Sequence, residues 1–164
     1  MKWLPCINSA LPPCPPLRRS SITICTKEKT NPPGPQMESK QYSGGCLCGH
    51  IRFTARGAAE NPHSCSCLNC QQHSGAPSLC WVEFPKASVQ WTGAGGMPTL
   101  YRSSDYSSRS FCPRCGSTLG AVDDAPGIAL VTGSFDDRDA PELRPTSHSY
   151  ADACPAWWKI DAAV

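Results

Sequence analysis

The chain has 164 residues and a formal net charge of +2, which suits one domain of ordinary size with an additional tail. Residues 1–40 carry six Lys or Arg against two Glu, whereas residues 41–164 carry nine against eleven acidic residues. The second part is slightly acidic and has no basic, aromatic-interleaved strand, which argues against a nucleic-acid partner. No run reaches the apolar length of a membrane span, so we expect no membrane partner either.

The first 40 residues contain eight of the 17 prolines and no periodic apolar pattern. This composition predicts a disordered, Pro-rich tail over residues 1–40 and one folded domain over residues 41–164. A chain start at Met37 stays open as an alternative. The N-terminus lacks the uninterrupted apolar segment of a secretory signal, and thiols close together in sequence suggest a reducing compartment, so we expect a cytoplasmic protein.

From Tyr42 onward, short alternating or apolar segments recur between Gly, Pro, Asp and Ser. Residues 57–62 are expected to form a loop, and no segment sustains a 3.6-residue apolar period. The pattern predicts an all-β fold of twisted antiparallel sheets. The expected strands cover residues 51–54, 79–84, 88–91, 100–102, 109–111, 118–122, 128–131 and 147–150.

One cysteine cluster, Cys65, Cys67 and Cys70, has the spacing C-x-C-x2-C. This spacing can bring three sulfurs onto one tetrahedral metal, and no fourth cysteine follows closely. Three protein ligands with one open position are typical of a catalytic zinc site.

A second set of thiols consists of two separate turns, Cys46 with Cys48 and Cys112 with Cys115. Pro113 stiffens the second turn, and Gly116 lets the backbone bend so that N–H groups point at the sulfurs. A redox pair shares the C-x2-C spacing, but no βαβ pattern surrounds it. We therefore predict a structural zinc with four cysteine ligands that ties the start of the domain to its middle.

The fourth partner of the three-thiol cluster is left open by the spacing, with water or a substrate thiol as the functional alternative. His73 would close the site as a structural one, because Cys70-x2-His73 completes three cysteines and one histidine. His63 and His148 are expected at the surface or beside the ligands. Cys80 and Cys154 are expected to be small buried apolar residues.

A zinc with three thiolate ligands is a weak Lewis acid, but it can hold an incoming thiol as thiolate at neutral pH. A thiolate held beside a small aldehyde would add to it and give an S-hydroxymethyl adduct, and the same site would catalyse the reverse cleavage. The spacing thus favours thiolate activation.

Three ordered segments resemble the glutathione-dependent formaldehyde-activating enzyme family, which includes the domain of centromere protein V. They are residues 44–49, residues 65–70 with Ser74-Gly75, and residues 109–117. The resemblance extends over roughly residues 42–160. It implies an Mss4-like fold and two zinc ions per chain, a structural one on Cys46, Cys48, Cys112 and Cys115 and a catalytic one on Cys65, Cys67 and Cys70.

The resemblance also implies carbon–sulfur lyase chemistry, forming S-(hydroxymethyl)glutathione from glutathione and formaldehyde. A small-molecule thiol is therefore the expected partner. The carboxylates of such a thiol need cations, which Arg109, Arg102 or Lys159 could supply, but each of the three fits a solvated strand face better. The competing hypothesis is a zinc-stabilised binding module without catalysis, in which both zinc ions are structural.

Overall fold

The computed structural model describes residues 40–158. The tail expected over residues 1–40 therefore lies outside the described residues, apart from Lys40. The one α-helix within residues 40–158 is α1, Leu68–Ser74, and four 3-10 turns accompany it, η1 to η4. The strands are β1 (Gln41–Gly45), β2 (Arg52–Arg56), β3 (Glu60–Cys65), β4 (Leu79–Pro85), β5 (Val89–Trp91), β6 (Thr99–Arg102), β7 (Ser107–Phe111), β8 (Thr118–Asp123), β9 (Gly127–Val131) and β10 (Ser147–Ser149).

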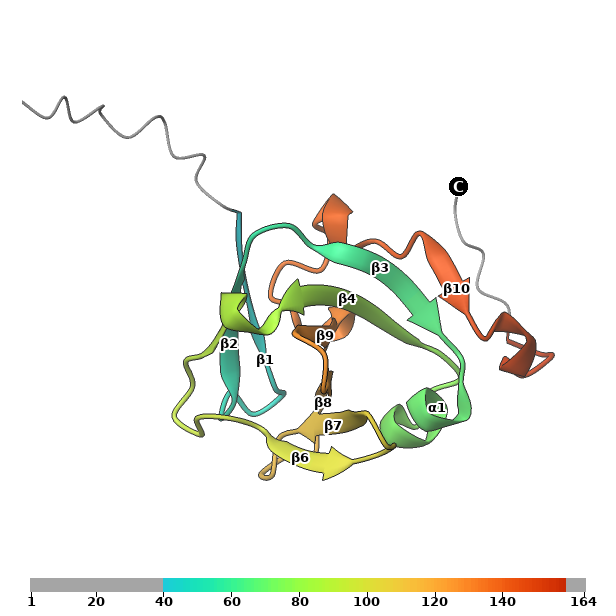
Figure 1. Ribbon diagram of the computed structural model, residues 1–164, viewed down its shortest axis with the longest axis horizontal. Helices are drawn as coiled ribbons and strands as arrows, with labels where there is room; N and C mark the ends of the chain where they lie inside the picture. Colours follow the sequence, from blue (N-terminus) through green and yellow to red (C-terminus); the bar gives the residue numbers. More distant parts are fainter. Residues whose placement is uncertain (1–39, 159–164) are drawn as a thin grey trace, which may run out of the picture. The chain divides into compact units, whose positions relative to one another are not determined.

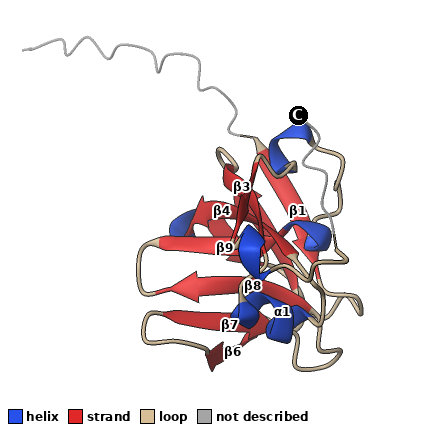
Figure 2. Ribbon diagram, turned by 90° about the vertical axis from the view of Figure 1, so that its right-hand side faces the viewer, coloured by secondary structure: helices blue, strands red, loops and turns tan. Residues whose placement is uncertain are grey.

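The strands form two sheets. The smaller has the order β1-β2-β5, and the larger has the order β10-β3-β4-β9-β8-β7-β6. The larger sheet is strongly curved, with β3 and β4 across the top of Figure 1, β6 and β7 along the bottom, and α1 to one side. All neighbouring strands are antiparallel except β10, which pairs with β3 in parallel. The predicted all-β class is confirmed, and Figure 2 shows strands β9, β8, β7 and β6 stacked in succession.

Strand β4 of the large sheet has one face toward the main core and the other toward the opposite side of the sheet. Val82 and Phe84 point into the core, where Phe84 packs with Tyr42, Phe53 and Phe135 from β1, β2 and the segment after β9. The centroids of Phe53 and Phe135 lie 5.2 Å apart in an edge-to-face arrangement, which stabilises aromatic pairs. The alternate residues of β4 therefore face away from this core and remain available to build a site.

The structure corrects two expectations. Glu60 and the residues up to Cys65 form β3, although residues 57–62 were predicted to be a loop. The polar residues and Pro62 of β3 do not show the apolar alternation expected of a strand. The pairing of β3 with β4 is also interrupted between Glu60 and His63. The helix α1 was also missed, because its seven residues are too few to show an apolar period. Across residues 40–158, no helix is long and apolar enough to cross a membrane.

Candidate metal centres

Four thiols from two turns that are far apart in the sequence lie close together in the structure. The sulfur atoms of Cys46, Cys48, Cys112 and Cys115 all lie within 4.8 Å of one another. The Sγ atoms of Cys46 and Cys48 are 3.6 Å apart, and those of Cys48 and Cys112 are 3.9 Å apart. Zinc–sulfur bonds of about 2.3 Å place the ligands of a tetrahedral site about 3.8 Å apart. The geometry therefore fits a zinc ion bound by four cysteines.

Hydrogen-bond donors surround these sulfurs, as expected for thiolates. The main-chain N–H of Ile51 donates to Cys46 Sγ at 3.2 Å, and Ser117 Oγ lies 3.2 Å from Cys115 Sγ. The Ser117 hydroxyl, together with the main-chain N–H groups of Ser117 and Cys48, lowers the pKa of the Cys115 thiol to about 5. Gly116 has the left-handed φ of 73° that the predicted turn requires. These donors favour the deprotonated form that metal binding needs.

The second group contains three thiols, those of Cys65, Cys67 and Cys70, with all sulfurs within 4.8 Å of one another. Cys65 ends β3, Cys67 is the N-cap of α1, and Cys70 lies in the first turn of that helix. Gly75 closes the helix in a left-handed conformation, with its N–H bonded to the Gln71 carbonyl. The Ser74-Gly75 pair thus ends the helix that carries Cys70.

Burial makes two of these thiols, Cys65 and Cys70, poor anions on their own. It is the main reason why the pKa values of the Cys65 and Cys70 thiols lie above their ordinary range. Three deprotonated sulfurs in this position therefore need a compensating cation. Zinc would supply it, and three thiol donors with a side open to a cavity suit a zinc site with one free position.

Only the three thiols belong to this group among the described residues, and none of the candidate fourth ligands is in it. The side-chain nitrogen Nε2 of His73 is buried without a hydrogen-bond partner, and burial followed by the charge of Arg109 lowers the pKa of this imidazole. His148 Nε2 lies 2.8 Å from the hydroxyl of Ser66, between two of the cysteines. Cys80 and Cys154 are only half-buried, so the expectation of small buried residues is wrong for both.

A cavity of about 370 Å³ opens beside the three thiols, on the face of the large sheet opposite the main core. Its floor is built from a row of cross-strand neighbours: Glu83 pairs with Ala129, Ala129 with Ala121, and Ala121 with Arg109. The two alanines leave space between the longer side chains at either end of the row. The remaining lining residues include His63, Trp81, Ser107, Asp123, Tyr106 and Tyr150.

Arg109 connects the floor of the cavity with the thiols. Its guanidinium carbon lies 5.5 Å from the centre of the Trp81 ring, and its Nη2 atom lies 4.0 Å from Cys70 Sγ. Within residues 40–158 it makes no ion pair, and its Nε atom is buried without a partner. The interpretation of Arg109 as a solvated surface residue is therefore wrong. Arg102 instead pairs with Asp124 at the surface, and Lys159 lies outside the described residues.

Asn61 positions two residues of the cavity wall. Its side-chain amide donates to Glu83 Oε1 at 2.6 Å, and its main-chain oxygen lies 2.8 Å from Nδ1 of His63. Because a carbonyl oxygen only accepts, Nδ1 of His63 is the donor in this contact. Sequence reasoning missed Asn61, Glu83 and Trp81. Alternation in the predicted strand at 79–84 places Trp81 and Glu83 on the same face. It could not show that Arg109 lies on that face of the sheet as well.

These features define a class of protein: an all-β domain with two cysteine clusters that could bind zinc, one of them at the wall of a cavity. The model of the family described as glutathione-dependent formaldehyde-activating enzyme matches residues 41–153. The chain belongs to this family, as the three resembling segments predicted.

Two further comparisons agree in part. The chain is 32% identical over 79 residues to an uncharacterized lyase of Schizosaccharomyces pombe, covering 48% of this chain and 56% of that protein. It thus spans about half the length of this curated relative. A crystal structure of a Rhodobacter sphaeroides protein has a TM-score of 0.50 and 16% identity, covering 65% of this chain and 99% of the other. This likeness concerns the fold alone.

Proposed function

We propose that this protein is a zinc-dependent carbon–sulfur lyase that forms or cleaves an S-hydroxymethyl thiol adduct, such as S-(hydroxymethyl)glutathione from glutathione and formaldehyde. The observation that carries the proposal is the opening of the three-thiol group into a cavity of about 370 Å³. Membership of the family and the lyase name of the yeast relative support the same reaction class.

In this proposal, Cys65, Cys67 and Cys70 hold the catalytic zinc, and Cys46, Cys48, Cys112 and Cys115 hold the structural zinc. The bound metal would supply a position on which an incoming thiol loses its proton at neutral pH. The thiol would approach from the cavity, because Cys65 and Cys70 are buried and all three cysteines line it. Free thiols persist in a reducing compartment, which supports a cytoplasmic location.

Arg109 is suited to act on the aldehyde. Its guanidinium lies beside Cys70 and over Trp81, with no acidic partner among the described residues. When the sulfur anion adds to the carbonyl carbon, a C–S bond forms and the carbonyl oxygen gains the negative charge. Arg109 would stabilise that oxygen before it takes a proton from water. In the reverse direction the hydroxyl loses its proton, the C–S bond breaks and the aldehyde leaves.

Native mass spectrometry of the full chain, with and without glutathione, tests the first half of the proposal. We expect two zinc ions per chain and one bound thiol. Cys67→Ser should lose one zinc and the bound thiol, whereas His73→Ala should keep both metals. Loss of the second zinc from His73→Ala would instead identify a closed structural site.

Formaldehyde exchange followed by nuclear magnetic resonance tests the second half. Wild-type protein should accelerate the exchange between free aldehyde and the thiol adduct, and Cys67→Ser should not. A protein with two zinc ions, no bound thiol and no acceleration would be a zinc-stabilised binding module, which would overturn the proposal.

A further inference from the structure

The residue between two of the three cysteines faces away from the cavity. Ser66 is fully buried, and unlike Cys65 and Cys67 it does not line the cavity. Cys65 ends β3, and Cys67 has an extended backbone conformation. Because successive side chains of an extended chain point to opposite sides, the two sulfurs share one side and the Ser66 hydroxyl points to the other, into the protein.

Three hydrogen bonds hold Ser66 in this position. Its main-chain N–H donates to the carbonyl oxygen of Ser149 at 3.0 Å, and its own carbonyl oxygen accepts from Nε2 of Gln71 at 2.6 Å. Its hydroxyl lies 2.8 Å from Nε2 of His148. A hydroxyl can both donate and accept, so this contact is satisfied in either tautomer of the imidazole. Every polar group of Ser66 therefore has a partner.

Most of these partners come from a segment late in the sequence. Strand β10 pairs in parallel with β3, with Ser149 opposite Cys65, and the two strands lie side by side in Figure 1. The bond from the Ser66 N–H continues this pairing one residue beyond the end of β3. Gln71 of α1 donates from the same Nε2 atom to the carbonyl oxygen of Ala153 at 3.1 Å. The segment from β10 to η4 therefore contacts both the strand end and the helix that supply the three cysteines.

We propose that His148 is a positioning residue for the three-thiol metal centre. It acts through the hydroxyl of Ser66 and so fixes the directions in which the two flanking sulfurs point. Ligands that are held in place before the metal arrives bind it more tightly than ligands that must first be ordered. Hydrogen bonds that orient metal ligands commonly contribute tenfold to 100-fold in metal affinity. The inference rests on the proposed function, because it needs a zinc ion on Cys65, Cys67 and Cys70.

The test measures zinc affinity by competition with a chromogenic chelator, on the full chain loaded with zinc. In His148→Ala the three-thiol site should bind zinc about tenfold to 100-fold more weakly, and the four-cysteine site should be unchanged. His148→Gln should bind zinc nearly as wild type does, because its amide retains a hydrogen-bonding group for the hydroxyl. Ser66→Ala should weaken the site as much as His148→Ala does. The double variant should be no weaker than either single variant, since both break the same bond.

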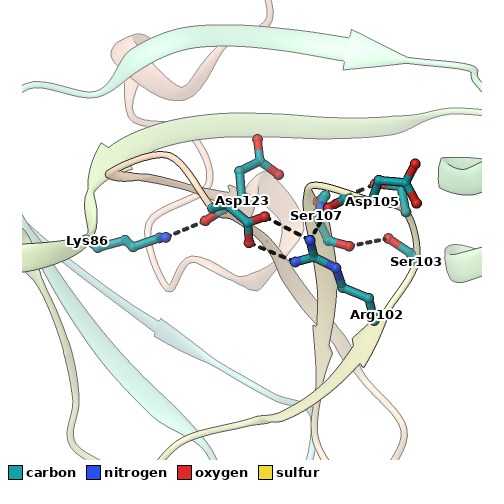
Figure 3. Close-up of polar contacts among 8 residues, drawn as sticks. Lys86, Arg102, Ser103, Asp105, Ser107 and Asp123 are labelled. Carbon is teal, nitrogen blue, oxygen red and sulfur yellow. Dashed lines mark hydrogen bonds and ion pairs between the residues drawn. The ribbon is translucent and has the colours of Figure 1, made fainter.

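Ser103→Ala is the matched control, because the Ser103 hydroxyl donates a comparable bond to the carbonyl oxygen of Ser107 at 3.1 Å, in a turn without cysteines (Figure 3). It should keep both zinc affinities.

Three results would overturn the positioning role and leave the lyase proposal intact. They are wild-type zinc affinity in His148→Ala, equal weakening by His148→Ala and His148→Gln, and additive effects of Ser66→Ala and His148→Ala. A wild-type chain that binds no second zinc ion would overturn both proposals. Circular dichroism and the zinc ion of the four-cysteine site show whether each variant is folded.

Discussion

Asn61 takes a left-handed backbone conformation, with a φ of 45°, at the irregularity in β3. Few residues other than glycine tolerate this region, and Asn does so more readily than most. The conformation lets its amide reach Glu83 while its carbonyl faces His63. One residue with an unusual backbone conformation therefore contacts two residues that line the cavity, Glu83 and His63.

Substitution of Asn61 separates its backbone role from its side-chain role. Asn61→Gly keeps the left-handed conformation and loses the amide, so we expect a small change in the free energy of unfolding. Asn61→Ala loses the amide as well but keeps a Cβ in the left-handed region, so we expect it to be about 1 kcal/mol less stable than Asn61→Gly. Urea denaturation of both variants measures the difference, and equal stability would show that the conformation is not strained.

At the scale of elements, β1 packs tightly against β2 and against the turn that follows β9. A Cβ on Gly44 would overlap the ring of Phe53 and the main-chain oxygen of Ser134. Phe53 belongs to the aromatic core, and Gly44 also forms an isolated bridge with Phe135. The absence of a side chain at this position therefore allows β1 to approach the core.

Gly44→Ala should lower the free energy of unfolding by about 1–3 kcal/mol, because the added methyl group overpacks a rigid environment. Gly133→Ala is the matched control, since a Cβ there meets no atom within 4 Å. It should change stability by less than about 0.5 kcal/mol. Thermal unfolding of the two variants compares them, and similar melting temperatures would contradict the close packing of β1.

At the scale of the whole molecule, two features join the small sheet to the large one. Cys46 and Cys48 follow β1, whereas Cys112 and Cys115 connect β7 with β8. Asp136, beyond β9, accepts bonds from Ser43 of β1 and Arg52 of β2. A metal on the four thiols would therefore cross-link sheets whose strands are far apart in sequence.

Loss of one ligand should have different consequences at the two centres. Cys112→Ser removes a ligand of the cross-link, so we expect no soluble folded protein. Cys67→Ser removes a ligand at the cavity wall and should leave a folded chain with one zinc fewer. Expression, circular dichroism and zinc content measure both variants, and equal collapse would refute the division into structural and catalytic ions.

The Asp136 ion pair should make stability depend on pH. Arg52, and then the hydroxyl of Ser43, lowers the pKa of Asp136 below its ordinary value of 3.8. A carboxyl with a depressed folded pKa contributes stability above its unfolded value, and this contribution is lost as the pH falls through the folded value. The side chain is 48% exposed, so the effect is modest.

The difference in unfolding free energy between wild-type protein and Asp136→Asn should therefore shrink as the pH falls below about 4. Urea titrations of both proteins across the acidic range measure it. A difference that stays constant with pH would mean that the ion pair does not stabilise the fold.

Local pattern alone determined most of the strands, but not β1 or β3, and it also determined the grouping of the thiols. Alternation and turn residues mark most strands, such as 79–84, because side chains in a strand change face at every residue. Close spacing groups Cys65 with Cys67 and Cys70, since one turn of chain brings all three sulfurs together. The family resemblance follows from the same short segments and is shown by the match over residues 41–153.

Only the tertiary structure decided what surrounds the thiols. Glu83, Ala129, Ala121 and Arg109 lie far apart in sequence and become neighbours through the pairing of four strands. Strand order and register depend on packing across the whole sheet, which no local pattern contains. For the same physical reason, Arg109 was assigned to a solvated surface, although the fold turns it toward Trp81 and Cys70.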